Sequence, residues 1–226
     1  KTKWGALGDN KTAVIEMAQI SGLALMNRNK LEPLTYTTYG MGEIIKECLD
    51  YGFNNFIIGI GGSATNDGGL GMAEALGAIL KDKNNKQIKR GIKGISSLNT
   101  IDLKDIDKRI YNSSFQIACD VNNPLYGPNG ATYIFGPQKG FKSEEIELID
   151  SYMKNYGNLI DSISKKEISN HPGSGAAGGI GAAAMYFLNA KLKSGSEIIL
   201  DYLNKADVFG IDEAQFFDLS IVNVCR

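Results

Sequence analysis

A glycine-rich stretch that directly follows an apolar segment places the strongest constraint on the fold of this chain. Residues 53–58 read FNNFII, and the next thirteen residues, GIGGSATNDGGLG (Gly59–Gly71), contain six glycines. Glycine tolerates a left-handed backbone and lets another group approach the main chain closely. The pattern predicts a buried strand, a tight turn and a helix, an arrangement that commonly presents backbone N–H groups to an anion.

The residues of this turn leave two interpretations open. In the first, backbone N–H groups and neutral side chains bind a phosphate or carboxylate, and Asp67 binds Mg²⁺ or accepts a proton from an attacking hydroxyl. This interpretation assigns phosphate or substrate binding to Gly61, Gly62, Ser63, Ala64, Thr65, Asn66 and Gly68. In the second, the glycines only supply positive φ angles to a tight turn, and Asp67 caps the following helix.

Known nucleotide-binding motifs fit the stretch less well. Gly59, Gly61 and Ala64 match the dinucleotide fingerprint G-x-G-x-x-G/A, and Asp82 follows near the spacing of the acidic residue that binds the ribose. However, residues 66–69 intervene before a helix can start, and that helix is short for a crossover. A Walker A motif is excluded because no Gly-Lys-Ser/Thr follows the glycines. An NAD-dependent oxidoreductase is therefore an alternative to a general anion site.

A second glycine-rich segment, His171–Gly181 (HPGSGAAGGIG), precedes an alanine-rich run. Its bare N–H groups and its hydroxyl predict a further anion contact at Gly173, Ser174 and Gly175. Small residues equally favour close packing of a helix against its neighbour, so both interpretations stand. His171, the single histidine, lies in a polar loop and is expected to be solvated.

The segment Cys119–Gly140 is predicted to be a long loop of the kind that often carries function. Asp120 lies where a predicted strand ends, which is where ligands bind in open α/β sheets. Turn chemistry explains the prolines and glycines of the segment but requires neither Asp120 nor Lys139. We therefore expect both residues in a site, with Asn122 and Asn123 as neighbouring contacts.

Alternating strand and helix patterns predict an α/β fold, a mixed sheet with flanking helices in a single unit that spans residues 1–226. The predicted strands are Thr12–Met17, Phe56–Ile60, Phe115–Val121 and Asp218–Val224. The predicted helices are Met41–Tyr51, Leu70–Ala78, Glu144–Lys166, Gly179–Leu192 and Glu197–Asn204. Residues 81–114 are polar and predict a loop with weak structure.

The helix predicted at Glu144–Lys166 has the clearest pattern. Apolar residues recur at spacings of three and four, and Ser143 precedes two glutamates as the expected N-cap. The residues expected to be buried on this stripe are Ile146, Ile149, Met153, Tyr156, Ile160 and Ile163.

Composition excludes several classes of partner. The formal net charge is −1, so no basic surface is expected for nucleic acid or an anionic membrane. No apolar run reaches the roughly 20 residues of a membrane span. The cysteines, Cys48, Cys119 and Cys225, are odd in number and widely spaced, which argues against a disulfide framework or a zinc site and favours the cytoplasm. A small-molecule substrate is the remaining expectation.

Five segments together resemble the bacterial type I family of glycerate kinases. They run in the family's order as VIEMAQISGLAL (Val14–Leu25), TTYGMGEII (Thr37–Ile45), IIGIGGSATNDGGLGM (Ile57–Met72), ACDVNNPLYGPNGATYIFGPQKG (Ala118–Gly140) and PGSGAAGGIGAA (Pro172–Ala183). The resemblance implies ATP-dependent transfer of the γ-phosphoryl group to D-glycerate, with Mg²⁺, and favours 2-phosphoglycerate as product. It also implies that this chain is mainly the domain inserted into a flavodoxin-like first domain, with residues 205–226 as the start of the return.

The resemblance assigns roles to residues already singled out. Gly61–Thr65 would cradle ATP phosphate or the glycerate carboxylate, Asp67 or Asp120 would hold Mg²⁺ or act as base, and Lys139 would offset charge on the transferred phosphoryl group. A non-catalytic, truncated domain that folds and forms a homodimer is the alternative from another class.

Overall fold

The sheet that carries the candidate site has the strand order β1-β2-β3-β6-β7. The computed structural model describes residues 2–27 and 31–202. The strands are β1 (Gly5–Ala6), β2 (Thr12–Glu16), β3 (Asn55–Gly59), β6 (Ser114–Ala118) and β7 (Lys191–Lys193). All neighbours pair in parallel except β1, which is antiparallel to β2. The predicted α/β fold with a mixed sheet and flanking helices is confirmed.

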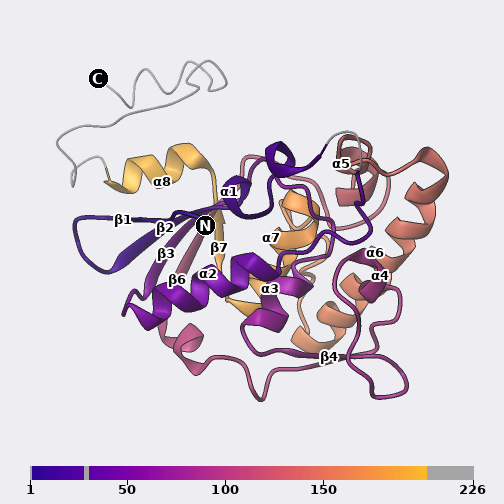
Figure 1. The fold of residues 1–226 in the computed structure, drawn as a ribbon, viewed down its shortest axis with the longest axis horizontal. Coiled ribbons are helices and arrows are strands. Elements are labelled where there is room, and N and C mark those ends of the chain that lie inside the picture. The colour runs from indigo at the N-terminus through magenta and orange to yellow at the C-terminus, as the bar shows by residue number, and fades with distance from the viewer. Residues whose placement is uncertain (1, 28–30, 203–226) are drawn as a thin grey trace.

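Helices surround this sheet. In the view of Figure 1, α2 lies below the strands and α8 above them, while α4, α5 and α6 lie on the side away from β1. The helical elements are α1 (Ala18–Ser21), η1 (Leu23–Leu25), α2 (Tyr39–Asp50), α3 (Leu70–Ala75), α4 (Ile92–Ile95), η2 (Lys108–Asn112), α5 (Ala131–Lys139), α6 (Ser143–Ser164), α7 (Ala176–Phe187) and α8 (Gly195–Tyr202). Each predicted helix corresponds to one of these, with ends shifted by a few residues where the structure describes them; the end predicted at Asn204 lies outside the described residues.

Residues 81–114 are more structured than their polar composition predicted. They complete an antiparallel pair, β4 (Ile79–Lys81) with β5 (Thr100–Asp102), and include α4 and η2. The prediction of a weakly structured loop was wrong because widely spaced apolar side chains anchor the segment in the core. These buried residues are Ile88, Ile92, Ile95, Ile106 and Ile110.

Two further predictions, both in the carboxyl-terminal half of the chain, were wrong. The helix predicted to reach Leu192 ends at Phe187, because Asn189 adopts a left-handed conformation (φ +49°) and the chain continues into β7. The predicted loop at Cys119–Gly140 contains α5, which ends at Lys139 and is capped by Gly140 with φ +99°. The strand predicted at Asp218–Val224 lies outside the described residues.

The long helix α6 agrees with the prediction except at its N-cap and at one residue of its apolar stripe. Ser143 is its first residue rather than its N-cap; Lys142 holds that position, and its N–H donates to the Glu145 carboxylate at 2.9 Å. Ile163 is 46% exposed, so it does not extend the buried stripe. The remaining apolar residues of the stripe are buried, which fixes α6 against the core.

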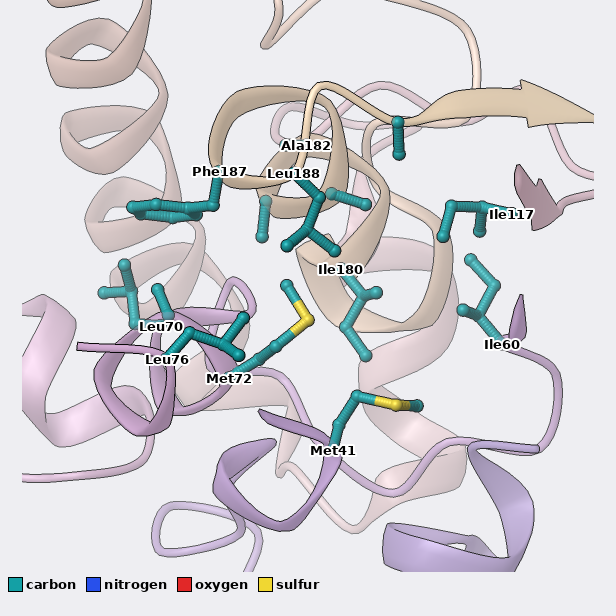
Figure 2. Close-up of a cluster of buried hydrophobic side chains, with 14 of the residues drawn as sticks. Met41, Ile60, Leu70, Met72, Leu76, Ile117, Ile180, Ala182, Phe187 and Leu188 are labelled. Atoms are coloured by element: carbon teal, nitrogen blue, oxygen red, sulfur yellow. The ribbon is translucent and has the colours of Figure 1, made fainter. Parts of the chain in front are cut away.

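The core lies between the sheet and α2, α3 and α7. Figure 2 shows side chains from these elements converging, with Ala182 of α7 among larger residues. Its labelled members are Met41, Ile60, Leu70, Met72, Leu76, Ile117, Ile180, Ala182, Phe187 and Leu188. Ala182, Ala183 and Ala184 are fully buried, so α7 can approach its neighbours closely. This packing holds the start of α7 beside the glycine-rich turn after β3.

Candidate functional site

A cavity of about 270 Å³ opens where the parallel strands β3 and β6 end. Its wall consists of the residues that follow these strands, one side of α5 and the start of α7. The lining residues are Ile60, Gly61, Gly62, Ser63, Ala118, Cys119, Asp120, Val121, Phe135, Gln138, Lys139, Ala176 and Ala177. The fold therefore brings three sequence-predicted groups together, namely Gly61–Ser63, Asp120 and Lys139.

The glycine-rich turn presents unpaired main-chain donors to this cavity. In the described part of the chain, the N–H groups of Gly61, Gly62 and Ser63 donate to no protein acceptor. Gly61 and Gly62 are exposed, and a Cβ added at Gly61 would meet no atom within 4 Å. Gly62 has φ +67°, a conformation that favours glycine. The backbone at Gly61 and Gly62 is therefore open to close approach by an oxyanion in the cavity.

The second half of the stretch packs inside the protein instead. The N–H of Gly68 donates to the carbonyl of Gly178 at 3.0 Å. A Cβ added at Gly178 would lie 2.1 Å from the carbonyl oxygen of Thr65, so the two glycine-rich segments touch backbone to backbone. Residues 64–68 are buried and do not line the cavity, which corresponds to the tight-turn interpretation for this half. Ala64, Thr65, Asn66 and Gly68 therefore help to hold the turn in place, and their contacts with a ligand stay a prediction.

Ser63 and Asn66 take part in this internal support. The Ser63 hydroxyl lies 3.0 Å from that of Thr65 and donates to the carbonyl of Ala177 at 3.3 Å. The Asn66 side-chain amide donates to the Thr132 hydroxyl at 3.0 Å. These bonds connect the turn to α5 and α7, the two helices that complete the cavity wall.

Lys139 is a buried amine at the cavity wall. Its side chain is 1% exposed, and its Nζ donates to the carbonyl oxygen of Thr65 at 2.6 Å. Burial lowers the pKa of Lys139 to about 7, and attraction to Asp67 opposes this shift. The amine is therefore hydrogen-bonded to the glycine-rich turn, and its pKa lies close to neutral pH.

Asp67 lies in the interior, and it does not line the cavity. Its side chain is 1% exposed and accepts hydrogen bonds from both the N–H and the hydroxyl of Thr38 and from the hydroxyl of Thr37. The N–H groups of Gly69 and Gly71 complete a set of five donors. Burial raises the pKa of the Asp67 carboxyl, while these donors favour the carboxylate. The residue thus ties the start of α3 to the start of α2.

Asp120 is the carboxylate that the structure places at the cavity. It is exposed, and its Oδ1 accepts a hydrogen bond from the N–H of Gly195 at 2.9 Å, at the start of α8. No cluster of three or more histidine, cysteine or acidic side chains that could hold a metal occurs among the described residues. Mg²⁺ commonly takes one or two carboxylates together with phosphate oxygens and water, so Asp120 fits a single ligand in such a site. Asp67 fits poorly because it is buried and its Oδ2 already accepts four of its five hydrogen bonds.

The second glycine-rich segment lies beside the first, but the groups that were predicted to contact an anion are hydrogen-bonded or packed within the protein. The Ser174 hydroxyl is buried and donates to the carbonyl of Ser169 at 2.8 Å. The N–H of Gly175 donates to the carbonyl of Asn123 at 2.9 Å, and Gly173 packs beside Cys119. None of Gly173, Ser174 and Gly175 lines the cavity, nor do Asn122 and Asn123. His171 is exposed, as expected.

Sequence reasoning missed part of the cavity wall. Phe135 and Gln138 line it from α5, and Ala177 lines it in a left-handed conformation with φ +53°. The signal for α5 was weak because Pro137 lies within the helix. Asp82, which the dinucleotide alternative needs near the turn, instead accepts N–H bonds from Asn84 and Lys86 in the turn after β4.

Comparisons with known proteins give a consistent result. The model of the glycerate kinase family matches residues 1–214. A protein named glycerate 2-kinase from Escherichia coli K12 is 50% identical over 201 residues, which cover 89% of this chain and 53% of that protein. Glycerate kinase from Bacillus subtilis 168 is 44% identical over 198 residues, which cover 88% of this chain and 52% of the relative.

A solved structure extends this result to the fold. The crystal structure of a protein assigned as glycerate kinase 2 from Salmonella typhimurium LT2 is 40% identical, with a TM-score of 0.88 over 98% of this chain and 63% of that one. The chain spans about half the length of the relatives named above. No helix within residues 2–27 and 31–202 is long and apolar enough to cross a membrane. By its sequence and its fold, this chain belongs to the glycerate kinase family.

Proposed function

We propose that this chain supplies part of the active site of an ATP-dependent glycerate kinase, which transfers the γ-phosphoryl group of ATP to D-glycerate. Membership of the family supports this activity, and the name of the Escherichia coli relative supports 2-phosphoglycerate as the product. ADP is the second product. The protein acts mainly by positioning its reactants and neutralising charge, as is general in phosphoryl transfer.

One observation carries the proposal, namely that unpaired N–H groups and a buried amine meet at one cavity. The N–H groups of Gly61, Gly62 and Ser63 would donate hydrogen bonds to an oxyanion, and the ammonium group of Lys139 would supply positive charge at the same cavity. The oxyanion is either an ATP phosphate or the glycerate carboxylate. Because Lys139 is held by the carbonyl of Thr65, its ammonium group and the turn keep a fixed relation to each other.

Asp120 would act at the open side of the same cavity. It would hold Mg²⁺, which screens phosphate charge when bound, or accept the proton of the attacking glycerate hydroxyl. Asp67 would position the turn through its five donors. Substrate contacts from Asn122, Asn123 and Gly173–Gly175 stay predictions, as do a cytoplasmic location and a homodimer.

A coupled ADP-release assay with D-glycerate, ATP and Mg²⁺ tests the proposal. We would assay the chain alone and the chain joined to the portions of the Escherichia coli relative that it does not span. In whichever form is active, Lys139→Met should reduce turnover at least tenfold, whereas the exposed matched control Lys93→Met should not. Folded but inactive protein in both forms would contradict the kinase assignment.

A binding measurement distinguishes the alternative, an NAD-dependent oxidoreductase, from the kinase. It requires NADH binding that is lost in Asp82→Lys, whereas the kinase assignment requires none. Fluorescence titration with NADH distinguishes the two.

A further inference from the structure

We propose that the cavity takes up one proton from solvent when it binds an oxyanion, and that the Nζ of Lys139 receives it. This inference rests on the oxyanion site of the proposed function and specifies how that site acquires its charge. The step transfers a proton from the buffer to the amine lone pair, and no bond of the oxyanion changes.

The contacts of Lys139 leave the amine ready for such a ligand. Its side chain is almost fully buried, and the carbonyl oxygen of Thr65 is its hydrogen-bond acceptor among the described residues. An ammonium group carries three N–H donors, so two have no acceptor there. Lys139 also lines the cavity, beside the unpaired N–H groups of Gly61–Ser63. A bound oxyanion would supply the missing acceptors and the missing negative charge.

The surroundings of Lys139 disfavour its ammonium form when no oxyanion is bound. Burial lowers the pKa of Lys139 to about 7, although Asp67 attracts the charged form. Asp67 itself already accepts five hydrogen bonds from other groups. An oxyanion next to the Nζ would raise the pKa of the amine, because an opposite charge at short range favours the charged form.

The ionisable groups at the cavity wall and in the core near Asp67 do not replace the Lys139 amine as the source of positive charge. Burial raises the pKa of Tyr156 on α6 and of the Cys119 thiol at the cavity wall, so both stay neutral near pH 7. Tyr186 on α7 has a raised pKa for the same reason. Asp120, at the cavity wall, is an acid. Lys139 is the basic side chain among the described residues that line the cavity.

The expected linkage follows from the pKa of about 7. At pH 8 about 0.9 of the free sites hold a neutral amine, so binding should take up about 0.9 proton per oxyanion. At pH 6 about 0.1 of the sites are neutral and uptake should fall to about 0.1 proton. Affinity should accordingly be about tenfold weaker at pH 8 than at pH 6.

Isothermal titration calorimetry measures this uptake directly. D-Glycerate and sulfate serve as probes, because neither titrates between pH 6 and pH 8, and they separate a carboxylate site from a phosphate-like one. Each is titrated into the whole chain in two buffers whose ionisation enthalpies differ, Tris and HEPES at pH 8 and imidazole and MES at pH 6. Proton uptake appears as a difference in binding enthalpy between the two buffers, present at pH 8 and nearly absent at pH 6.

Two variants locate the proton. Lys139→Met should abolish the buffer-dependent enthalpy, and the exposed control Lys93→Met should retain it. Lys139→Arg, whose guanidinium is always charged, should bind the probe without proton uptake. Binding by the unmodified chain with equal enthalpies in both buffers at pH 8 would overturn the inference and leave the oxyanion site standing. If neither probe binds, the oxyanion site itself is overturned.

Discussion

The contact between the two glycine-rich segments predicts that two glycine-to-alanine substitutions have different effects: one lowers stability, and the other weakens oxyanion binding. Gly178→Ala places a Cβ 2.1 Å from the carbonyl oxygen of Thr65, at a residue with φ +73°. A left-handed conformation costs a non-glycine residue roughly 1–2 kcal/mol, and overpacking adds about 1–3 kcal/mol. The free energy of unfolding should therefore fall by roughly 2–5 kcal/mol.

Gly61→Ala is the matched variant, in the same turn but on its open side. An added Cβ there meets no atom within 4 Å, so stability should change by no more than about 0.5 kcal/mol. The methyl group would instead stand beside N–H groups that line the cavity. Loss of one hydrogen bond to a charged group is worth about 1.5–3 kcal/mol, so sulfate or D-glycerate should bind at least about tenfold more weakly.

Urea unfolding followed by circular dichroism, together with calorimetric titration, separates the two effects. Thermal melts add a second estimate, since about 1 kcal/mol corresponds to roughly 2–4 °C for a domain of this size. A Gly178→Ala protein as stable as the parent would refute the close-packing argument. A Gly61→Ala protein with undiminished oxyanion binding would refute the role of the turn in the cavity.

Two further predictions concern the buried ionisable residues. Lys139 has a folded-state pKa of about 7 against an ordinary value of 10.5, so above pH 7 the unfolded chain binds more protons and stability rises with pH. The stability of the parent relative to Lys139→Met should rise by roughly 2 kcal/mol between pH 7 and pH 9, from denaturant melts at each pH; a flat difference would show that the amine is not buried in this way. Asp67→Asn should lower the free energy of unfolding by roughly 1–3 kcal/mol, because its amide NH2 cannot accept the hydrogen bond of the Gly69 N–H and the four bonds to the other oxygen no longer go to a charged group. Asp82→Asn, at an exposed turn, serves as its control, and equal urea midpoints for the two variants would contradict the assigned role of Asp67.

The sequence predicted the local elements better than it predicted the contacts between them. Strand β3, the turn at Gly61 and the long helix α6 follow from apolar runs, glycine content and helical spacing, all of which are local signals. Which glycines face a cavity and which face another backbone depends on where α7 packs, and the pattern at Gly178 does not encode this. For the same reason Asp67 and Lys139 could be singled out as charged residues in suggestive segments, but their burial could not be read from neighbouring residues.

The way in which the cavity is assembled has a consequence for how the protein is made. Lys139 and Thr65 are joined across 74 positions of the chain, and Ser63 and Ala177 across 114. Contacts between such distant residues, in a sheet with parallel strands, form slowly because long loops must close first. During synthesis, the turn after β3 leaves the ribosome well before α5 and α7 are available to it. The oxyanion site therefore forms late, and a chain interrupted before Ala176 would contain the glycine-rich turn and α5 but lack the part of the cavity wall that α7 supplies.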